Sequence, residues 1–439
     1  MRKLLSLLLV AAYLFVGAAP SAATARGARE LPKNPDTYQL IILFNEIFNK
    51  TRQDYVDEVS DQRLIESAIN GMLSALDPHS GYMNEESFRE MQIQTKGEFG
   101  GIGLEVGMEN GVVVVISPIE GTPGYKAGLQ PGDLITHIDD KAVHGLTLTE
   151  AVNRMRGEPR SRVKLTVQRR GVAAPLTFNI VREVIRVRVV RSAVKGGNIG
   201  YIRITSFSEN AEAMTRRAIT DIKAKTKNNV IGYIIDMRNN PGGLLDQAIG
   251  VADLFLDKGE IVSTRPRDET RAERHNATAG DITGGKPIVV LINAGSASAA
   301  EIVAGALQDH KRAVVVGTKS FGKGSVQSVY PIQGFGGIRL TTARYYTPSG
   351  RSIQAKGIEP DIVIRQATLK ETESGEGISE GNLVNALPPG QRDNQRGNQA
   401  PPAAADNEVS NDYQLSRAKD ILRAIAVYSG RAQQSKPSR

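Results

Sequence analysis

Hydrophobic and polar positions change their spacing along the chain, and each change predicts a different kind of element. Over residues 36–96 the apolar residues recur at intervals of three and four, which predicts amphipathic helices. The repeating positions are Leu40, Ile41, Phe44, Ile47 and Phe48. A second helix is predicted from Asp61 to Leu76, because Asp77-Pro78 stops it. The apolar stripe fits either a dimer face or packing against the rest of the chain.

Residues 97–182 change to short runs that are typical of β-strands. The predicted strands are Ile102–Val106, Gly111–Ile116, Asp133–Ile138, Arg162–Gln168 and Leu176–Val181. One helix, Leu148–Met155, interrupts them. Strands and a single helix in so short a segment predict a small, partly open barrel.

Residues 183–365 alternate between continuous apolar strands, Gly-marked turns and helices. The predicted order is strand Val230–Asp236, helix Leu244–Leu256, strand Ile288–Ile292, helix Ala299–Gln308 and strand Ala313–Val316. Strands that are apolar throughout and separated by helices indicate a buried, largely parallel sheet.

The start of the chain predicts export. Arg2 and Lys3 precede an apolar run over residues 4–16, and small residues then lead to Ala23-Thr24-Ala25. This pattern is typical of a signal peptide, here residues 1–25, and favours a periplasmic protein. An uncleaved membrane anchor is the alternative, although the run is shorter than the roughly 17 residues that cross a bilayer.

The end of the chain has a different composition. Gly, Pro, Asn, Gln and Ala dominate residues 366–410, which predicts a disordered linker. A tail over residues 411–439 follows, with a short amphipathic helix predicted over Tyr413–Val427.

Composition narrows the possible chemistry. The chain has no Cys, which excludes disulfides, thiolate catalysis and Cys-based metal sites. Its net charge is +8, but the basic residues are scattered, so nucleic acid is not an expected partner. No metal motif such as HExxH is present, and no cofactor is expected. Residues 97–103 resemble a phosphate loop only weakly, because a strand is predicted to follow them.

Two serines stand where the predicted strand Ile288–Ile292 passes into a helix. The turn between the strand and the helix reads Asn293-Ala294-Gly295-Ser296-Ala297-Ser298. Free N–H groups at a helix N-terminus stabilise an oxyanion, so a serine in this turn is a candidate nucleophile. An N-cap is the commoner role for such a serine.

A second turn, residues 237–243, follows the predicted strand Val230–Asp236 and ends in Pro241-Gly242-Gly243. Glycine allows a close approach of the backbone, so these N–H groups are candidates for the other half of an oxyanion hole. The alternative is a strand-to-helix turn that binds nothing.

A nucleophilic serine needs a base. None of the five histidines stands in a Gly-rich turn of the parallel region, so a Ser-His-Asp triad is not indicated. Lys323 does stand in one, after the third predicted strand and therefore at the same end of the sheet. Its pKa must fall from about 10.4 to about 7, which destabilises the charged form by about 4–5 kcal/mol. Desolvation in a closed site supplies a change of that size.

From Thr37 to Ile364 the chain resembles the carboxyl-terminal processing peptidases, the S41 serine peptidases with a Ser-Lys pair and an inserted PDZ domain. Motifs in the family's order carry the resemblance. They are Leu76-Asp77-Pro78-His79-Ser80, Phe99-Gly100-Gly101-Ile102-Gly103-Leu104, Ala127-Gly128-Leu129, Asp236 through Gly243, Gly295 through Ala299 with Glu301, Gly322-Lys323-Gly324 with Gln327, and Thr341 through Gly350.

The resemblance implies a multidomain α/β fold. A ClpP/crotonase-like peptidase core is expected at residues 183–365, with a PDZ domain inserted before it at residues 97–182 and a helical region at residues 36–96. It also chooses between the serines: Ser298 corresponds to the nucleophile, Lys323 to the base and Gln327 to the residue that orients the lysine. The expected oxyanion donors are the backbone amides of Gly243 and Ala299.

The same resemblance implies the substrate. The C-terminal carboxylate of a protein or peptide is expected on the loop of Gly100, Gly101, Ile102 and Gly103, with its last residues added as a strand. A homo-oligomer and an activating adaptor protein stay open as further partners. Two other functions remain alternatives: a PDZ binding module on an inactive core, and acyl-CoA chemistry of the crotonase kind, which an exported protein does not favour.

Overall fold

The computed structural model describes residues 36–109, 111–368, 386–387 and 412–434. The predicted signal peptide and nearly all of the predicted linker lie outside these ranges. The chain divides after Ala68 into two compact units, which are described separately.

The first unit contains α1 (Thr37–Asp54) and the beginning of α2 (Asp61–Ser74). Asp36 caps α1, since its carboxylate accepts a hydrogen bond from the amide of Gln39 at 2.8 Å. Arg52 donates to Asp61 at 3.3 Å and connects the two helices. Both helices confirm the prediction from spacing, although α2 ends at Ser74, two residues before the predicted end.

A six-stranded sheet forms the centre of the second unit, in the order β10-β11-β12-β15-β16-β19. All its pairs are parallel except β10 with β11. The strands are β10 (Val190–Lys195), β11 (Ile199–Ile204), β12 (Gly232–Asp236), β15 (Ile288–Ile292), β16 (Val314–Gly317) and β19 (Ile362–Val363). The predicted parallel sheet is confirmed.

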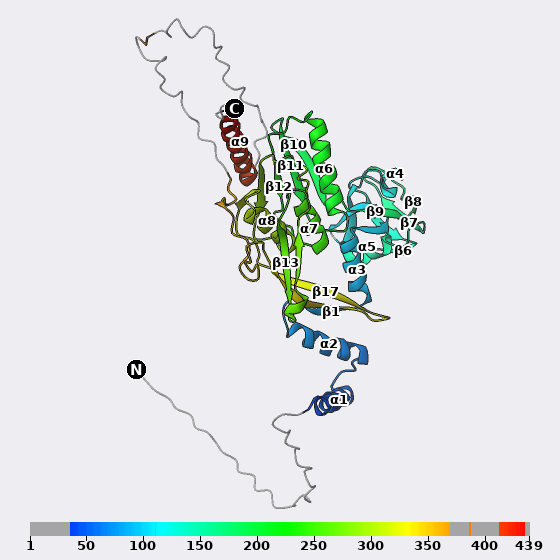
Figure 1. The fold of residues 1–439 in the computed structure, drawn as a ribbon. Coiled ribbons are helices and arrows are strands. Elements are labelled where there is room, and N and C mark those ends of the chain that lie inside the picture. The colour runs from blue at the N-terminus through cyan, green and yellow to red at the C-terminus, as the bar shows by residue number, and fades with distance from the viewer. Residues whose placement is uncertain (1–35, 110, 369–385, 388–411, 435–439) are drawn as a thin grey trace, which may run out of the picture. The chain divides into compact units, whose positions relative to one another are not determined.

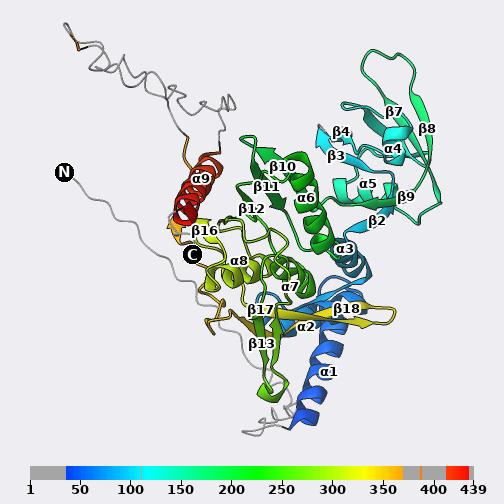
Figure 2. The same cartoon turned by 45° about the horizontal axis from the view of Figure 1, so that its top comes forward.

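Helices cover both faces of this sheet, which explains why its strands are apolar throughout. Alternate residues, such as Tyr233 and Ile235, face α6 (Ala211–Lys225), α7 (Leu245–Asp253) and α8 (Ala299–Asp309). The residues between them face α9 (Tyr413–Gln434), whose Leu415, Ala418 and Leu422 are buried there. Figures 1 and 2 show α9, in red, on one side of β10–β12 and α6 on the other. The tail helix was predicted, but not its position or its full length.

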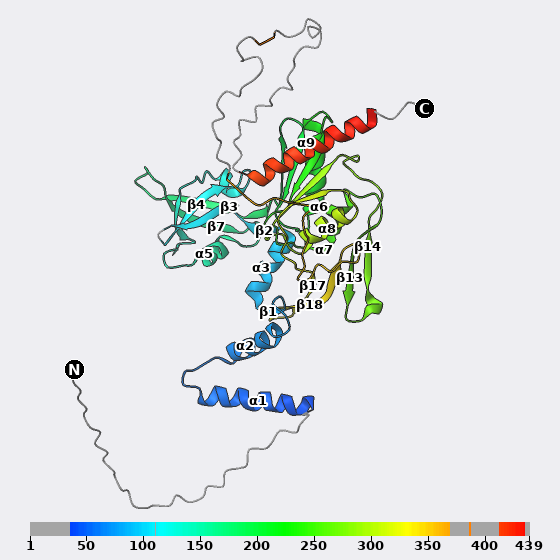
Figure 3. The ribbon, with the colours of Figure 1, turned by 90° about the vertical axis from the view of Figure 1, so that its left-hand side faces the viewer.

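A second sheet lies next to helix α8 of the core. It is antiparallel and was not predicted. Its order is β1-β18-β13-β14, and β17 also pairs with β18. The strands are β1 (Gly81–Met83), β13 (Glu260–Pro266), β14 (Glu273–Asn276), β17 (Ser325–Ile332) and β18 (Gly336–Tyr346). Because β1 pairs with β18, the segment after α2 joins the hairpin that follows Lys323 (Figure 3).

In the sequence, the residues between β1 and β10 include a small barrel-like domain with its own core. Its sheet has the order β3-β4-β5-β7-β8, and β6 pairs with β5. The elements are β3 (Leu104–Glu109), β4 (Val112–Pro118), α4 (Pro123–Lys126), β5 (Leu134–Ile138), β6 (Lys141–Ala142), α5 (Leu148–Met155), β7 (Arg162–Gln168) and β8 (Leu176–Val181). The predicted strands and helix are confirmed, with the first strand beginning two residues later. A two-stranded ladder of β2 (Glu98–Gly101) and β9 (Glu183–Arg186) closes the domain, and α3 (Glu85–Lys96) precedes it.

Candidate active site

The turn after β12 is held by a buried ion pair. Asp236 is fully buried and accepts hydrogen bonds from the guanidinium of Arg238 at 2.6 and 3.0 Å. The other edge of the same guanidinium donates to Asp412, just before α9, at 2.6 and 2.8 Å. Burial opposes ionisation of Asp236, but the bonds and charge of Arg238 outweigh it and lower the pKa of this carboxyl.

The same turn leaves one backbone amide unused. Asn240 accepts a hydrogen bond from the amide of Gly242 at 2.9 Å and donates to the carbonyl of Ile204 at 2.9 Å. Gly243 has φ 145°, and a Cβ there would lie 2.2 Å from the Phe207 carbonyl oxygen, so only glycine fits. Among the hydrogen bonds of the described residues, none uses the Gly243 N–H. The two glycines therefore differ: the Gly242 amide is bonded to Asn240, whereas the Gly243 amide has no partner among the described hydrogen bonds.

Ser298 precedes the first residue of α8 and has φ 54° and ψ −113°. These angles are rare for a residue with a side chain, and they place Ser298 against the Gly243 turn. A Cβ built on Gly242 would lie 2.8 Å from the Ser298 Cβ and 3.0 Å from the Ala299 nitrogen. The Ala299 N–H likewise has no partner among the described hydrogen bonds.

Ser296 has a structural role. It is fully buried, and its hydroxyl donates to the Met237 carbonyl at 2.8 Å and accepts from the Asn293 amide at 3.0 Å. These bonds join the two strand-end turns. Ser298, in contrast, faces the large cleft described below.

Glu301 connects the serine to the lysine turn. It is fully buried in the first turn of α8. Its Oε2 accepts from the amides of Ser298 at 2.8 Å and Lys323 at 2.9 Å. Its Oε1 accepts from the amide of Gly322 at 2.7 Å and from the hydroxyl of Ser320 at 2.5 Å. Sequence patterns predicted no role for Glu301, because most of its hydrogen-bond donors come from a turn about 20 positions away.

Lys323 lies in the same cleft as Ser298. Burial and the nearby charge of Arg339 lower its pKa, against the opposing effects of Asp77 and Glu301. The direction is the one that a lysine base requires.

Gln327 has its own partners on the hairpin. Its side-chain amide donates to the hydroxyls of Ser325 at 2.9 Å and Thr341 at 3.3 Å. The Thr341 amide in turn donates to Ser80, whose hydroxyl donates to Asp77 at 2.7 Å. The turn at residues 76–80 therefore reaches the lysine side of the cleft, which sequence spacing did not indicate.

One cleft of about 1120 Å³ brings most of the predicted residues together. Gly243, Ser298, Lys323 and Gln327 line it, and Ala299 lies directly behind the serine. Its walls include apolar side chains of α3, α7 and β17, among them Ile93, Ile249 and Val326.

Comparisons with known proteins identify the family of the chain. The model of peptidase family S41 matches residues 198–364, a PDZ domain matches residues 114–169, and the N-terminal domain of activating protease CtpB matches residues 19–87. A carboxy-terminal-processing protease of Bartonella bacilliformis is 49% identical over 90% of this chain and 91% of its own length.

The chain belongs to peptidase family S41. It is a serine peptidase of the carboxy-terminal-processing group, with a PDZ domain. Carboxy-terminal processing protease CtpA of Bacillus subtilis is 38% identical over 72% of this chain and 67% of its own length. A solved photosystem II D1 C-terminal processing protease is 30% identical over 75% of this chain and 94% of its own, with a TM-score of 0.42.

The predicted carboxylate loop of the peptidase is partly built into a strand. Gly100 and Gly101 belong to β2 and pair with β9, while Ile102 and Gly103 form the short link to β3. The carbonyls of this link are occupied, since that of Ile102 accepts from Gly124 at 2.7 Å and that of Gly103 from Ile119 at 2.9 Å. Next to the link, β3 is an edge strand of its sheet.

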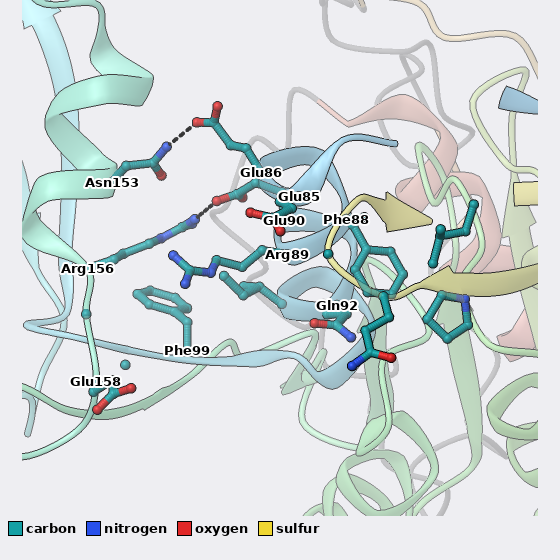
Figure 4. Close-up of a pocket in the computed structure, with 18 residues that line it drawn as sticks. Glu85, Glu86, Phe88, Arg89, Glu90, Gln92, Phe99, Asn153, Arg156 and Glu158 are labelled. Atoms are coloured by element: carbon teal, nitrogen blue, oxygen red, sulfur yellow. Dashed lines mark hydrogen bonds and ion pairs between the residues drawn. The ribbon is translucent and has the colours of Figure 1, made fainter. Parts of the chain in front are cut away.

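Helix α3 of the peptidase contacts the PDZ domain beside this loop. Figure 4 shows Asn153 donating to Glu86, at 2.7 Å, and Arg156 paired with Glu90. The guanidinium of Arg156 also lies 4.7 Å from the centre of the Phe99 ring. These residues line a pocket between α3 and the PDZ domain. Glu90 and Ile93 line both this pocket and the cleft that contains Ser298, so α3 borders both.

No helix in the described part of the chain has the length and hydrophobicity needed to span a membrane.

Proposed function

We propose that this S41 peptidase cleaves peptide bonds with Ser298 as nucleophile and Lys323 as general base. One observation carries the proposal: the serine, a lysine with a lowered pKa and two unpaired backbone amides meet at one cleft. Neutral Lys323 accepts the hydroxyl proton of Ser298, and the alkoxide attacks the scissile carbonyl to form an acyl-enzyme. Negative charge on the carbonyl oxygen is then stabilised by the amides of Gly243 and Ala299.

The lysine completes both halves of the reaction. Protonated Lys323 gives its proton to the leaving amine, and in its neutral form it then activates the water that hydrolyses the acyl-enzyme. Glu301 fixes the distance between the two partners, because one carboxylate oxygen accepts from the backbone amides of both. Gln327 orients the turn through Ser325 and Thr341.

Recognition of the substrate is proposed to begin at its C-terminus. The carboxylate binds the backbone of Gly100, Gly101, Ile102 and Gly103, and the preceding residues pair with the free edge of β3 opposite α5. We place the PDZ domain at residues 97–182 and the peptidase core at residues 183–365.

The proposed location is outside the cytoplasm. The charged start, the short apolar run and the A-x-A site of residues 1–25 support export by a signal peptide. N-terminal sequencing of the protein purified from the cell envelope tests this, and a mature chain that still begins at Met1 would contradict it.

The catalytic proposal is tested on an unfolded reporter protein with an apolar C-terminus. Ser298→Ala and Lys323→Ala are each expected to lower turnover by about 10⁴-fold or more, with unchanged thermal unfolding. Lys319→Ala is the matched control for the lysine, since Lys319 pairs with Glu359 at the surface and does not line the cleft. Turnover that survives Ser298→Ala would show that the assigned nucleophile is wrong.

A further inference from the structure

Tyr345 lies beside Ser298 and is bonded to the turn that carries Lys323, although no role has been given to it so far. It is the penultimate residue of β18, is only 4% exposed and lines the catalytic cleft. Its side chain reaches the Ser298 side chain closely enough for the two hydroxyls to interact. Its backbone amide donates at 2.8 Å to the carbonyl of Gly324, the residue directly after Lys323.

We propose that Tyr345 is a third catalytic side chain of this site, which donates a hydrogen bond to the Ser298 oxygen while Lys323 removes the serine proton. The inference rests on the proposed function and adds a residue to it. The donated bond occupies one lone pair of the oxygen. The serine's own O–H is thereby left free to point towards the lysine.

The tyrosine cannot serve as the base. Burial raises its pKa to about 12. It therefore keeps its proton throughout the range in which a peptidase works, and it acts as a neutral donor. No proton leaves it during the reaction.

The step balances without Tyr345 changing its protonation. The O–H bond of Ser298 breaks and its proton goes to the Lys323 nitrogen. The released electron pair forms the bond from the serine oxygen to the carbonyl carbon, and the carbonyl π electrons move to the oxyanion. As the serine oxygen gains charge, the bond from Tyr345 strengthens, so it stabilises the transition state more than the ground state.

The neighbouring residue supplies a matched control. Tyr346 alternates to the other face of β18, where the guanidinium of Arg265 lies 4.0 Å from the centre of its ring. It does not line the cleft. Tyr345→Phe and Tyr346→Phe thus remove one hydroxyl each from adjacent positions of one strand, and both keep the aromatic ring.

The experiment measures two reactions of the full mature chain. The first is cleavage of the unfolded reporter, from which kcat and KM are obtained as functions of pH. The second is labelling by a fluorescent fluorophosphonate, which reacts with an activated serine and needs no peptide turnover; the labelled residue is identified by mass spectrometry. Thermal unfolding is recorded for every variant.

We expect Tyr345→Phe to lower kcat and the labelling rate by about 10²-fold, the size typical of one lost transition-state donor. KM and the acid limb of kcat/KM should not move, because Lys323 still titrates among Asp77, His79, Arg339 and Glu301. Tyr346→Phe should match the wild type in both reactions.

Three results would overturn the inference. Wild-type rates in Tyr345→Phe would make Tyr345 a packing residue only, and faster rates would make it a restraint on Ser298. A shifted acid limb would mean that it acts through Lys323 instead. Failure of the proposed function looks different: the wild type then cleaves no reporter, or Ser298→Ala does. The labelling rate still tests Tyr345 if the reporter is a poor substrate.

Discussion

The PDZ domain and the peptidase core each contain a buried aspartate that is held by two bonds from a neighbouring arginine, and in the core Arg203 also pairs with that aspartate at 3.0 Å. In the PDZ domain, Asp133 is 1% exposed and accepts from Arg169 at 2.7 and 2.8 Å. In the core, Asp236 accepts from Arg238 at 3.0 and 2.6 Å. Both carboxyls have lowered pKa values, because the arginine outweighs the effect of burial.

The two pairs differ in what else the arginine holds. Arg169 donates its remaining bond to the Gly128 carbonyl, within the same small domain. Arg238 reaches Asp412 at the start of α9, and it stands in the turn that ends at Gly243. The same pair of side chains therefore stabilises a domain in one case and holds the turn that ends at Gly243 in the other. The role of a buried ion pair thus depends on the third group that its arginine contacts.

The largest effect is expected from Arg238→Ala. It leaves the fully buried Asp236 with Arg203 at 3.0 Å and the Tyr201 hydroxyl at 2.8 Å, so the cost in folding free energy should be about 3 kcal/mol, the lower end of the range for a broken buried pair. The turn that carries Gly243 then loses its anchor, and kcat should fall by about 10²-fold. Denaturant unfolding and reporter cleavage measure the two effects. An unchanged kcat would show that the pair is only structural, as proposed for Arg169.

Arg169→Ala should cost a similar free energy of unfolding, about 3–5 kcal/mol, but within the PDZ domain. Binding of a C-terminal peptide should weaken, while cleavage of a short peptide that bypasses the domain should keep its kcat. Fluorescence anisotropy and peptide turnover separate these outcomes. If kcat for the short peptide falls as far as in Arg238→Ala, the proposed difference between the pairs is wrong.

Neither of the two aspartate–arginine pairs should determine how turnover depends on pH. Both aspartates titrate below their ordinary range, so their stabilising effect is present above the unfolded pKa and disappears only as pH falls through the lower folded value. Lys323 has a pKa lowered from 10.5, so kcat/KM should rise tenfold per pH unit as pH approaches that lowered value from below. A profile between pH 5 and pH 10 checks this for the wild type and both arginine variants. If the rising part of the kcat/KM profile shifts to another pH in Arg238→Ala, the pair of Asp236 and Arg238 affects the titration of Lys323.

The smallest effect is expected from Asp412→Asn. The Asp412 side chain is 33% exposed, so solvent screens its pairing with Arg238 and the cost should be at most about 1 kcal/mol. Asp236 still holds the guanidinium, and kcat should fall only a fewfold. The exposed pair of Arg417 and Asp420 on the same helix offers Asp420→Asn as the control. A loss as large as that of Arg238→Ala would make α9 part of the active site.

Sequence patterns predicted the regular parts of this fold because burial dictates their spacing. Strand Ile288–Ile292 and helix Leu148–Met155 have the predicted limits, since their apolar residues are buried on both faces or on one. The β17–β18 hairpin was missed, because it is polar and partly exposed and its pairing with β1 joins residues over 250 positions apart.

Only those parts of the candidate site that lie close together in the sequence could be predicted. The turns with Gly243, Ser298 and Lys323 were found from their place after parallel strands. Spacing could not choose between Ser296 and Ser298, whereas in the structure the Ser296 hydroxyl is bonded to Met237 of the neighbouring turn and to Asn293 of its own turn. It could not show the pairing of Arg238 with Asp412 either, because 174 positions separate the two residues.

The backbone of Ser298 has a consequence for the evolution of this enzyme. Ser298 has φ 54° and ψ −113°. A residue with a side chain pays roughly 1–3 kcal/mol of folding free energy to adopt these angles, whereas glycine adopts them without strain. Replacement by Gly would therefore give a chain more stable than the wild type, and Ala would not. Selection for stability alone would remove the proposed nucleophile, so the serine persists only while turnover is under selection.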